Sequence, residues 1–567
     1  MPTLSQILHP SYTETPDRVT VYLQFPRQPD VSVTYRQLMH GAAGYAQGLE
    51  RAGLQPGEVV ILILQHDEAL LHAFFGAVLC GAIPSIMPFL TEKLTPEKYR
   101  QDLAALISVT QPAAILTYPE FADEARAAIH SAEPTSEPTS VRAVLVSSDI
   151  QPVEAIDVAL LPGLQCSPDD IVLLQHSSGT TGLQKGVALS HRAVFHQLEH
   201  YARAIQLNSE SDVVVSWLPL YHDMGLIAGF LMPILTRTPL ALMSPFDWVR
   251  APAKLLQAVS RYKGTLSWLP NFAFNFCAHA GRIRDRDLRE ANVDLSSWRA
   301  VINCSEPMHY HSHQMFAERF APYGLRPEAL ATCYAMAENV FAVTQGGIDA
   351  PVMVDEVDER ALSVERRATP VVGGLKLLSC GPALPNVRVR VLDEQRVELP
   401  ERYIGEIALQ SDCLLTGYFH RPDLTEQAFY DGWYLTGDLG YIVNGEVFIT
   451  GRKKDLIIVG GKNVYPQDLE RLAGEVPGIH TGRVVAFGIY DDDSGTEEVV
   501  VVAEAESEDE RQRLGDAVRQ RITRGTDITL RYAHIVGPKW LIKTSSGKIA
   551  RAANRDKYLA EIRRSGL

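Results

Sequence analysis

Residues 177–186 read SSGTTGLQKG, and they come shortly after the apolar, strand-like run IVLLQ (171–175). Small residues after a strand let backbone N–H groups wrap around a polyanion, and Lys185 adds a positive charge. The spacing is not that of a Walker A loop, in which GxxxxGK is followed by Ser or Thr. The stretch predicts a phosphate-binding loop. The alternative is an ordinary surface turn, because Gly and Ser also dominate turns.

On both sides of this loop, short β-branched runs alternate with amphipathic helical patterns. The strand-like runs stand at 59–64, 113–118, 213–219 and 265–270, and the helical patterns at 68–82 and 252–262. Such alternation predicts parallel sheets covered by helices. Residues 385–450 instead read as short strands and turns, and the chain after Gly451 reads as a compact α+β unit.

These patterns predict an α/β protein with two domains. We expect a large N-terminal domain (1–450) that ends in a small β-rich subdomain (about 383–450), and a small α+β C-terminal domain (456–567). The charged stretch GRKKD (451–455) lies between them and is the expected hinge. Residues 131–140, SAEPTSEPTS, have the composition of an exposed linker.

The composition narrows the possible functions. In 567 residues, 46% are hydrophobic and 21% charged, as in ordinary soluble globular proteins. A net charge of −15 argues against a general nucleic-acid binder. The seven cysteines form no CxxC pair, which favours a reducing compartment. We see no signal peptide and no apolar run that could span a membrane, so the expected location is the cytoplasm.

Four further motifs follow the loop in a fixed order: YAMAE (334–338), YLTGD (434–438), GRKKD (451–455) and KTSSGK (543–548). Together the five stretches resemble the adenylate-forming superfamily, which includes acyl-CoA synthetases, luciferases and peptide-synthetase adenylation domains. The resemblance covers nearly the whole chain. It implies a mobile C-terminal domain and the use of ATP to convert a carboxylate into an acyl adenylate, with release of pyrophosphate.

The resemblance also implies roles for individual residues on the nucleotide side. Thr180, Thr181 and Lys185 would hold the β- and γ-phosphates, and Glu338 with Thr180 would bind Mg²⁺. Asp438 would bind the ribose hydroxyls. Arg452 would bind ribose or phosphate, or else simply pair with Asp455. The complete expected ATP- and AMP-binding set is Ser177, Ser178, Gly179, Thr180, Thr181, Gly182, Lys185, Asn303, Ser305, Tyr334, Ala335, Met336, Asp438 and Arg452.

Some of these positions depart from the family pattern. Asn303 and Ser305 belong to NCSEP (303–307), where the family often has NGAEP. Cys304 and Ser305 depart from that pattern, but both are small, so we expect the backbone path to be kept. The catalytic residues would be Lys548, His222 and Glu338. His222, in WLPLYHDMG (217–225), would orient the acid, while Asp223 supports its loop. Lys548 would pair with the carboxylate and the α-phosphate, and rotation about Lys454 would then withdraw it. The expected acid pocket is Pro270, Asn271, Phe272 and Phe274.

One branch of the superfamily fits best. Five stretches resemble those of fatty acyl-AMP ligases, which load carrier proteins. They are LPLYHDMGLI (218–227), PNFAF (270–274), DLSSWR (294–299), GLRPEA (324–329) and YPQDLE (465–470). Glu338 and Gly381 are 43 positions apart (381 − 338). This interval is longer than we expect in an ordinary CoA ligase. The extra residues, about 350–372, match the place of an insertion that restrains the C-terminal domain in that branch. The alternative is a long surface loop. AMAEN in place of the commoner GLAEA is a departure from the pattern.

Three other functions compete with this one. A CoA ligase would pass the acyl group to CoA. An amino-acid adenylation enzyme needs an acidic partner for the amine, and NFAFNFC (271–277) offers none. A non-catalytic protein on the same fold would not need Lys185, Glu338, Asp438 and Lys548. We expect ATP, Mg²⁺, a carboxylic acid and an acidic acyl carrier protein as ligands. A basic tail (539–567) that includes Arg551, Arg555 and Arg564 could steer the carrier protein.

Overall fold

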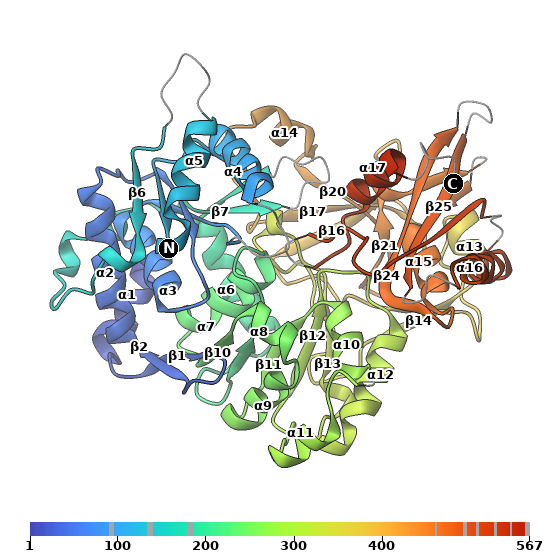
Figure 1. Cartoon of the computed structure of the whole chain (residues 1–567), viewed down its shortest axis with the longest axis horizontal. Helices are drawn as coiled ribbons and strands as arrows, with labels where there is room; N and C mark the ends of the chain where they lie inside the picture. The colour runs from blue at the N-terminus through green and yellow to red at the C-terminus, as the bar shows by residue number, and fades with distance from the viewer. Residues whose placement is uncertain are drawn as a thin grey trace.

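The computed structural model describes residues 1–89, 96–132, 140–177, 185–279, 281–459, 462–491, 496–505, 510–526, 530–544 and 547–561. Most of the expected linker at 131–140 and residues 178–184 of the phosphate loop lie outside these ranges. Figure 1 shows the large N-terminal part on the left and below, and the C-terminal elements together on the right.

Two parallel sheets form the frame of the N-terminal part, as the alternating pattern predicted. The larger sheet has the order β13 (Leu330–Cys333), β12 (Ala300–Cys304), β11 (Leu266–Leu269), β9 (Val214–Ser216), β10 (Leu240–Met243), β1 (Val19–Gln24) and β2 (Val31–Thr34). The smaller has the order β4 (Ile83–Ile86), β3 (Val59–Ile63), β5 (Ala114–Thr117) and β6 (Ala143–Val146). Only β2 runs antiparallel to its neighbour. Strands such as β3 are buried along their whole length, because helices cover both faces.

Apart from α1, which precedes β1, the helices of this part lie in the connections between the strands. Several begin with a side-chain cap, as where Asp67 accepts a hydrogen bond from Leu70 N at the start of α3. The helices are α1 (Leu4–Glu14), α2 (Tyr35–Arg51), α3 (Glu68–Cys80), α4 (Pro96–Thr110), α5 (Ala122–Ala132), α6 (His191–Ala204), α7 (Met232–Leu235), α8 (Pro245–Arg250), α9 (Ala253–Tyr262), α10 (Asn271–Ala278), α11 (Asp285–Glu290), α12 (Tyr310–Phe320), α13 (Glu359–Val364) and α14 (Pro422–Gln427).

Antiparallel sheets complete the N-terminal part. The segments expected to be strands between 385 and 450 form β16 (Val387–Leu392), β17 (Gly405–Ser411), β20 (Trp433–Val443) and β21 (Glu446–Arg452), with β19 (Phe429–Tyr430) at an edge. Beside them lie β7 (Ile171–Ser177), β8 (Lys185–Ser190) and β18 (Gly417–Tyr418). Pairing of β7 with β8 brings Ser177 opposite Lys185, so the two ends of the phosphate loop are fixed close together.

The C-terminal part has its own buried cores. Leu469, Val501 and Val518 belong to one core, and Phe487, Val500 and Tyr558 to another. The elements are β22 (Ile457–Val459), β23 (Lys462–Val464), α15 (Pro466–Gly474), β24 (Ile479–Asp491), β25 (Thr496–Ala505), α16 (Arg511–Gly525), β26 (Tyr532–Val536) and α17 (Arg551–Glu561). The α/β class with a large N-terminal and a small C-terminal domain is thus confirmed.

The surplus residues after Glu338 are ordered, so the surface-loop alternative is wrong. They form β14 (Val354–Val357), α13 and β15 (Leu375–Leu378), and β14 pairs antiparallel with β15. Val357 and Leu362 pack in one cluster with Tyr441 of the β-rich sheet and with Tyr465, which precedes α15. Within the described ranges, no helix is long and apolar enough to cross a bilayer.

Candidate active site

A cavity of about 2710 Å³ lies where the two parts of the chain meet, and it brings most of the predicted residues together. Its walls come from the carboxyl ends of parallel strands, from β20, from the hinge stretch and from the turn before α17. The predicted residues that line it are Lys185, His222, Asn271, Phe272, Ser305, Tyr334, Ala335, Met336, Glu338, Asp438, Arg452, Lys454 and Lys548.

Three predicted residues lie behind the wall instead. Phe274 is fully buried and stacks on His313, with ring centroids 5.1 Å apart. Asn303 is also fully buried, and its amide donates to Asn271 Oδ1 over 3.0 Å. Pro270 precedes α10 and does not line the cavity. The predicted contacts of these three residues with ligands are therefore corrected. Ser178, Gly179, Thr180, Thr181 and Gly182 lie outside the described residues, as does the Ser177 side chain.

On one side of the cavity, Asp438 is held by two partners. Tyr334 Oη donates to Asp438 Oδ2 over 2.5 Å, and Arg452 Nε pairs with Oδ1 over 3.2 Å. The carboxylate raises the pKa of Arg452. Arg452 forms its ion pair with Asp438 and not, as in the alternative, with Asp455, which pairs with Arg551 over 2.6 Å. The arrangement offers carboxylate acceptors beside a fixed cation, which suits a ribose next to a phosphate.

A second group links the end of the phosphate loop with Glu338. Tyr418 Oη donates to Glu338 Oε1 over 3.0 Å and lies 3.0 Å from Tyr434 Oη. Lys185 Nζ lies over the Tyr418 ring, 4.8 Å from its centroid. Burial raises the pKa of Glu338, and the hydrogen bond from Tyr418 opposes that shift. Sequence reasoning assigned no role to either tyrosine, since their contacts join distant parts of the chain.

The Glu338 carboxylate has the chemistry that Mg²⁺ prefers. It is a hard oxygen ligand that lines the cavity, and its orientation is fixed by Tyr418. Across the ranges that the structure covers, no three His, Cys, Asp or Glu side chains form a metal site by themselves. Mg²⁺ is commonly held by one or two carboxylates together with substrate phosphates, so Glu338 fits such a shared site.

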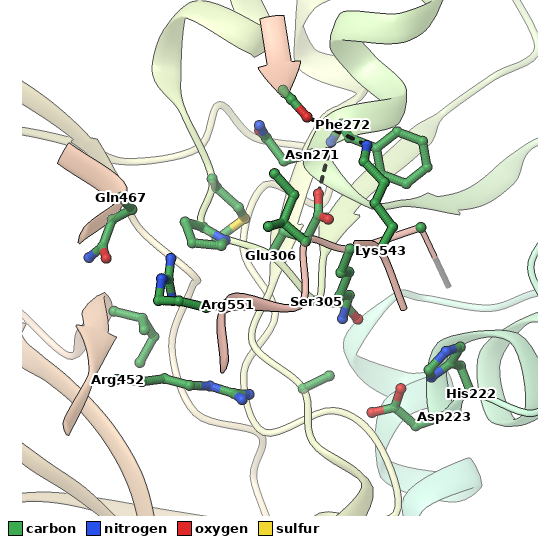
Figure 2. Close-up of a pocket in the computed structure, with 18 of the residues that line it drawn as sticks. His222, Asp223, Asn271, Phe272, Ser305, Glu306, Arg452, Gln467, Lys543 and Arg551 are labelled. Atoms are coloured by element: carbon green, nitrogen blue, oxygen red, sulfur yellow. Dashed lines mark hydrogen bonds between the residues drawn. The ribbon is translucent and has the colours of Figure 1, made fainter. Parts of the chain in front are cut away.

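Lys548 lines the cavity from the turn before α17, and its charge acts on His222 and Asp223. Burial and the charge of Lys548 lower the pKa of His222 to about 3, so the ring is neutral. Burial raises the pKa of Asp223, and the charge of Lys548 opposes that shift. Asp223 Oδ1 also accepts a hydrogen bond from Met224 N over 2.9 Å, in agreement with its expected support of the loop. Figure 2 shows His222 and Asp223 on the wall that faces Glu306 and Lys543.

The apolar end of the cavity is built from aromatic rings. Trp217 and Trp248 stack with centroids 3.6 Å apart and an interplanar angle of 8°. Phe272 presents its edge to both rings, and Phe276 lies 5.4 Å from Trp248. Asn271, Phe272, Asn275 and Phe276 of α10 line the cavity, two pairs one turn apart that mark one face of the helix, and His279 lines it just after the helix ends. That helical period was the sequence signal that separates these residues from the buried Phe274.

The hinge stretch has partners on both sides. Arg452 pairs with Asp438 of β20, and Lys453 Nζ pairs with Glu406 of β17 over 3.0 Å. Asp455 pairs with Arg551, which also pairs with Glu470 of α15 over 2.8 Å. Arg551 is therefore committed to ion pairs, and it is not part of a free basic face as the sequence suggested.

The inserted helix α13 contacts the C-terminal part directly. Glu359 Oε1 pairs with Arg471 Nη2 of α15 over 3.1 Å. Arg471 also pairs with Glu475 over 3.0 Å. Nearby, burial raises the pKa of Asp468 to about 7, and the charge of Arg471 opposes the shift. The insertion thus holds the C-terminal part by an ion pair as well as by the packing around Tyr465.

Comparison with known proteins identifies the family of the chain. A family model described as AMP-binding enzyme matches residues 9–419. The chain is 32% identical over 559 residues to the long-chain-fatty-acid–AMP ligase FadD26 of Mycobacterium bovis, covering 94% of this chain and 92% of that protein. It is 29% identical over 572 residues to JamA of Moorena producens, a medium-chain-fatty-acid acyl-carrier-protein ligase, covering 97% and 93%. A structure from a study of fatty acyl-adenylate ligases of E. coli and L. pneumophila superposes with a TM-score of 0.88 at 29% identity, covering 100% of this chain and 98% of that one.

Proposed function

The chain belongs to the AMP-binding enzyme family as an adenylate-forming ligase of the fatty acyl-AMP ligase type, and we propose that it makes acyl-AMP for transfer to a carrier protein. The acid would be a fatty or other hydrophobic carboxylic acid. In the first step a carboxylate oxygen bonds to the α-phosphorus of ATP and the bond to pyrophosphate breaks. In the second, the phosphopantetheine thiol of an acyl carrier protein takes the acyl group and AMP leaves.

The observation that carries this proposal is the position of Lys548. One cavity contains Lys548, the ribose- and phosphate-type partners Asp438 and Lys185, and the aromatic wall around Phe272. A cation on a separate domain can stand between a carboxylate and an α-phosphate and lower their repulsion. Mg²⁺ held by Glu338 would supply further positive charge to the phosphates.

Two observations support a carrier protein as the acceptor. JamA acts on an acyl carrier protein by its name, and the chain is similar to it over nearly its full length. In addition, α13 of the insertion pairs with Arg471 of the C-terminal part. By the resemblance to acyl-AMP ligases, such a contact limits the rotation that admits CoA.

Acidic side chains that sequence reasoning did not find in the pocket do lie in the cavity. Asp223 and Glu306 both line it. Each already accepts a backbone hydrogen bond, from Met224 N and Phe272 N, and each feels the charge of Lys548. They are thus occupied by protein groups, which argues against their use for the amine of an amino acid.

The test is a panel of acids with ATP and Mg²⁺, read by pyrophosphate exchange. Straight-chain and aryl-alkanoic acids should support exchange, and amino acids should not. Adding a phosphopantetheinylated carrier protein should give the acyl-carrier thioester, while adding CoA should give little acyl-CoA. Abundant acyl-CoA would make the protein a CoA ligase, and exchange with amino acids alone would make it an amino-acid adenylation enzyme.

A further inference from the structure

Glu306 is a carboxylate inside the cavity for which the reaction described above has no use. It follows β12 in the NCSEP stretch, and its Oε2 accepts a hydrogen bond from Phe272 N over 2.9 Å. Phe272 is the second residue of α10, and the residue before that helix, Pro270, provides no side-chain cap. Glu306 therefore caps the helix that carries the aromatic wall.

A carboxylate at this depth needs a cation nearby. Burial raises the pKa of Glu306, and the charges of Lys548 and then Lys543 oppose that shift. Leaving a desolvated anion without a positive partner would be costly. Both cations come from one short segment of the C-terminal part, although the N-terminal part supplies Glu306.

That segment, which we call the lysine turn, comprises residues 543, 544 and 547–549. Lys543 pairs with Ile549 across it, Thr544 N donates to Lys548 O over 2.7 Å, and Gly547 N donates to Thr544 O over 2.9 Å. Gly547 has a φ of 90°, which favours glycine. The turn therefore fixes Lys543 and Lys548 relative to each other.

The lysine turn lies against the helix that Glu306 caps. A Cβ added to Gly547 would stand 3.9 Å from Phe272 Cζ. Lys543 Nζ donates to Gly482 O over 3.5 Å, and Figure 2 shows its side chain beside Glu306 and Phe272. Glu306 thus accepts a hydrogen bond from the aromatic wall at Phe272 N, and it interacts electrostatically with the lysines of the C-terminal part.

We propose that Glu306 is a positioning residue that holds the lysine turn in the adenylating arrangement, with Lys543 as its charge partner. The charge of Lys548 acts on Glu306 more strongly than that of Lys543 does, but Lys548 would turn to the carboxylate and the α-phosphate when the acid and ATP bind, and Lys543 would stay beside Glu306. The inference rests on the proposed function only for the role of Lys548. It adds that the two lysines have different tasks, since one docks the domain and the other meets the substrates.

The kinetic test compares Glu306→Gln, Lys543→Met and the double variant, using the acid that gives the fastest exchange in the panel. Gln keeps an oxygen for Phe272 N, so the cap stays and only the charge is lost. Each single change should lower kcat for pyrophosphate exchange about tenfold, and the double variant should fall no further. KM for the acid and transfer from supplied acyl-AMP should stay unchanged. Glu210→Gln, at an exposed ion pair with Arg18, is the control.

Two kinetic outcomes would overturn the proposal. If kcat of the double variant falls by the product of the two single-variant fold-decreases, Glu306 and Lys543 do not act as a pair. If transfer falls as much as exchange, Glu306 serves the fold and not the docking of the turn.

Hydrogen exchange gives a readout that needs no acid. In the full-length protein, Glu306→Gln should speed amide exchange at Thr544 and Gly547 about tenfold, while Glu210→Gln should not. Unchanged exchange at the lysine turn would overturn the inference even in an active enzyme. A wild type that is inert with every acid would instead defeat the proposed function, and the exchange measurement would still decide the role of Glu306.

Discussion

Replacing Lys548 with Ala should separate the two half-reactions. Lys548 is the cation whose charge acts on all three of His222, Asp223 and Glu306, as the pKa shifts of these groups indicate; Arg452 also acts on Asp223 and Lys543 on Glu306. Two unit charges about 4 Å apart interact by about 4 kcal/mol at an effective dielectric constant near 20. Since 1.36 kcal/mol is a factor of ten in rate, losing that interaction in the transition state costs about 10³-fold.

Part of this loss is recovered within the site. Without Lys548, Asp223 and Glu306 lose the charge that opposes the rise of their pKa values, so both take up protons more readily. Their repulsion of the incoming carboxylate then falls. We therefore expect adenylate formation to drop by about 10² to 10³-fold in Lys548→Ala.

The assay measures pyrophosphate exchange and, separately, acyl transfer from supplied acyl-AMP to a carrier protein. Exchange should fall as stated, and transfer should keep most of its rate, because the thiol attack does not need the lysine. Lys263→Ala, at an exposed pair with Asp294, serves as the control. Equal loss of both half-reactions would refute the reasoning and make Lys548 a structural residue.

Three further changes test other contacts. Tyr418→Phe removes the hydrogen-bond donor to Glu338 and should raise the Mg²⁺ concentration for half-maximal pyrophosphate exchange about tenfold. An unchanged Mg²⁺ titration would show that this hydrogen bond does not contribute to Mg²⁺ binding. Asp438→Asn should raise KM for ATP about tenfold or more with a smaller effect on kcat, and a change in KM for the acid alone would contradict a ribose role. Burial raises the pKa of Asp468 from 3.8 to about 7, so its carboxylate lowers stability as pH rises through that window. Asp468→Asn should therefore raise Tm at pH 8 and leave it unchanged near pH 3. A rise in Tm confined to acid pH would contradict the expected direction of the pH dependence.

The motifs correctly predicted residues that meet in one cavity, because each motif is a short, local pattern, and the nucleotide-binding roles assigned to these residues stay predictions. Lys185, Tyr334, Glu338, Asp438 and Lys548 all line one cavity although they are far apart in sequence. The order of the motifs along the chain was enough for this, since a shared fold places the ends of the same strands together. The acid pocket was predicted less well, because it was read as a continuous stretch.

Helical geometry explains the errors in the acid pocket. A helix turns its residues to different sides, so PNFAF could not line a wall with every aromatic residue. Phe272 faces the cavity, and Phe274, two positions later, faces the core. Applying the 3.6-residue period to 271–279 would have selected Phe276 in its place.

Contacts between distant segments explain the residues that were missed. Tyr418 gains its role from Glu338 and Lys185, and Arg551 from Asp455 and Glu470. No local pattern marks such pairs, because each partner alone is an ordinary tyrosine or arginine. Glu306 stood inside a quoted motif, yet only its depth in the cavity shows that it needs a cation.

The ion pairs of the hinge define what a domain rotation must keep and what it must break. Lys453 pairs with Glu406 on the N-terminal side, and Asp455 pairs with Arg551 on the C-terminal side. Only Lys454 lies between them, so rotation there leaves both pairs intact. This geometry supports the proposal that Lys454 is the hinge.

Other contacts cannot survive such a rotation. The Glu359–Arg471 pair joins the insertion to α15, and the lysine turn meets Glu306 across the cavity. The Glu359–Arg471 pair lies at the edge of the C-terminal part, and the contact of the lysine turn with Glu306 lies in the cavity. The two contacts therefore restrain the same rotation from two places. The Glu306 contact forms part of the adenylating site, whereas the Glu359 contact holds the domain without touching a substrate. Weakening Glu359–Arg471 should therefore speed departure from the adenylating arrangement and leave the adenylating site itself intact.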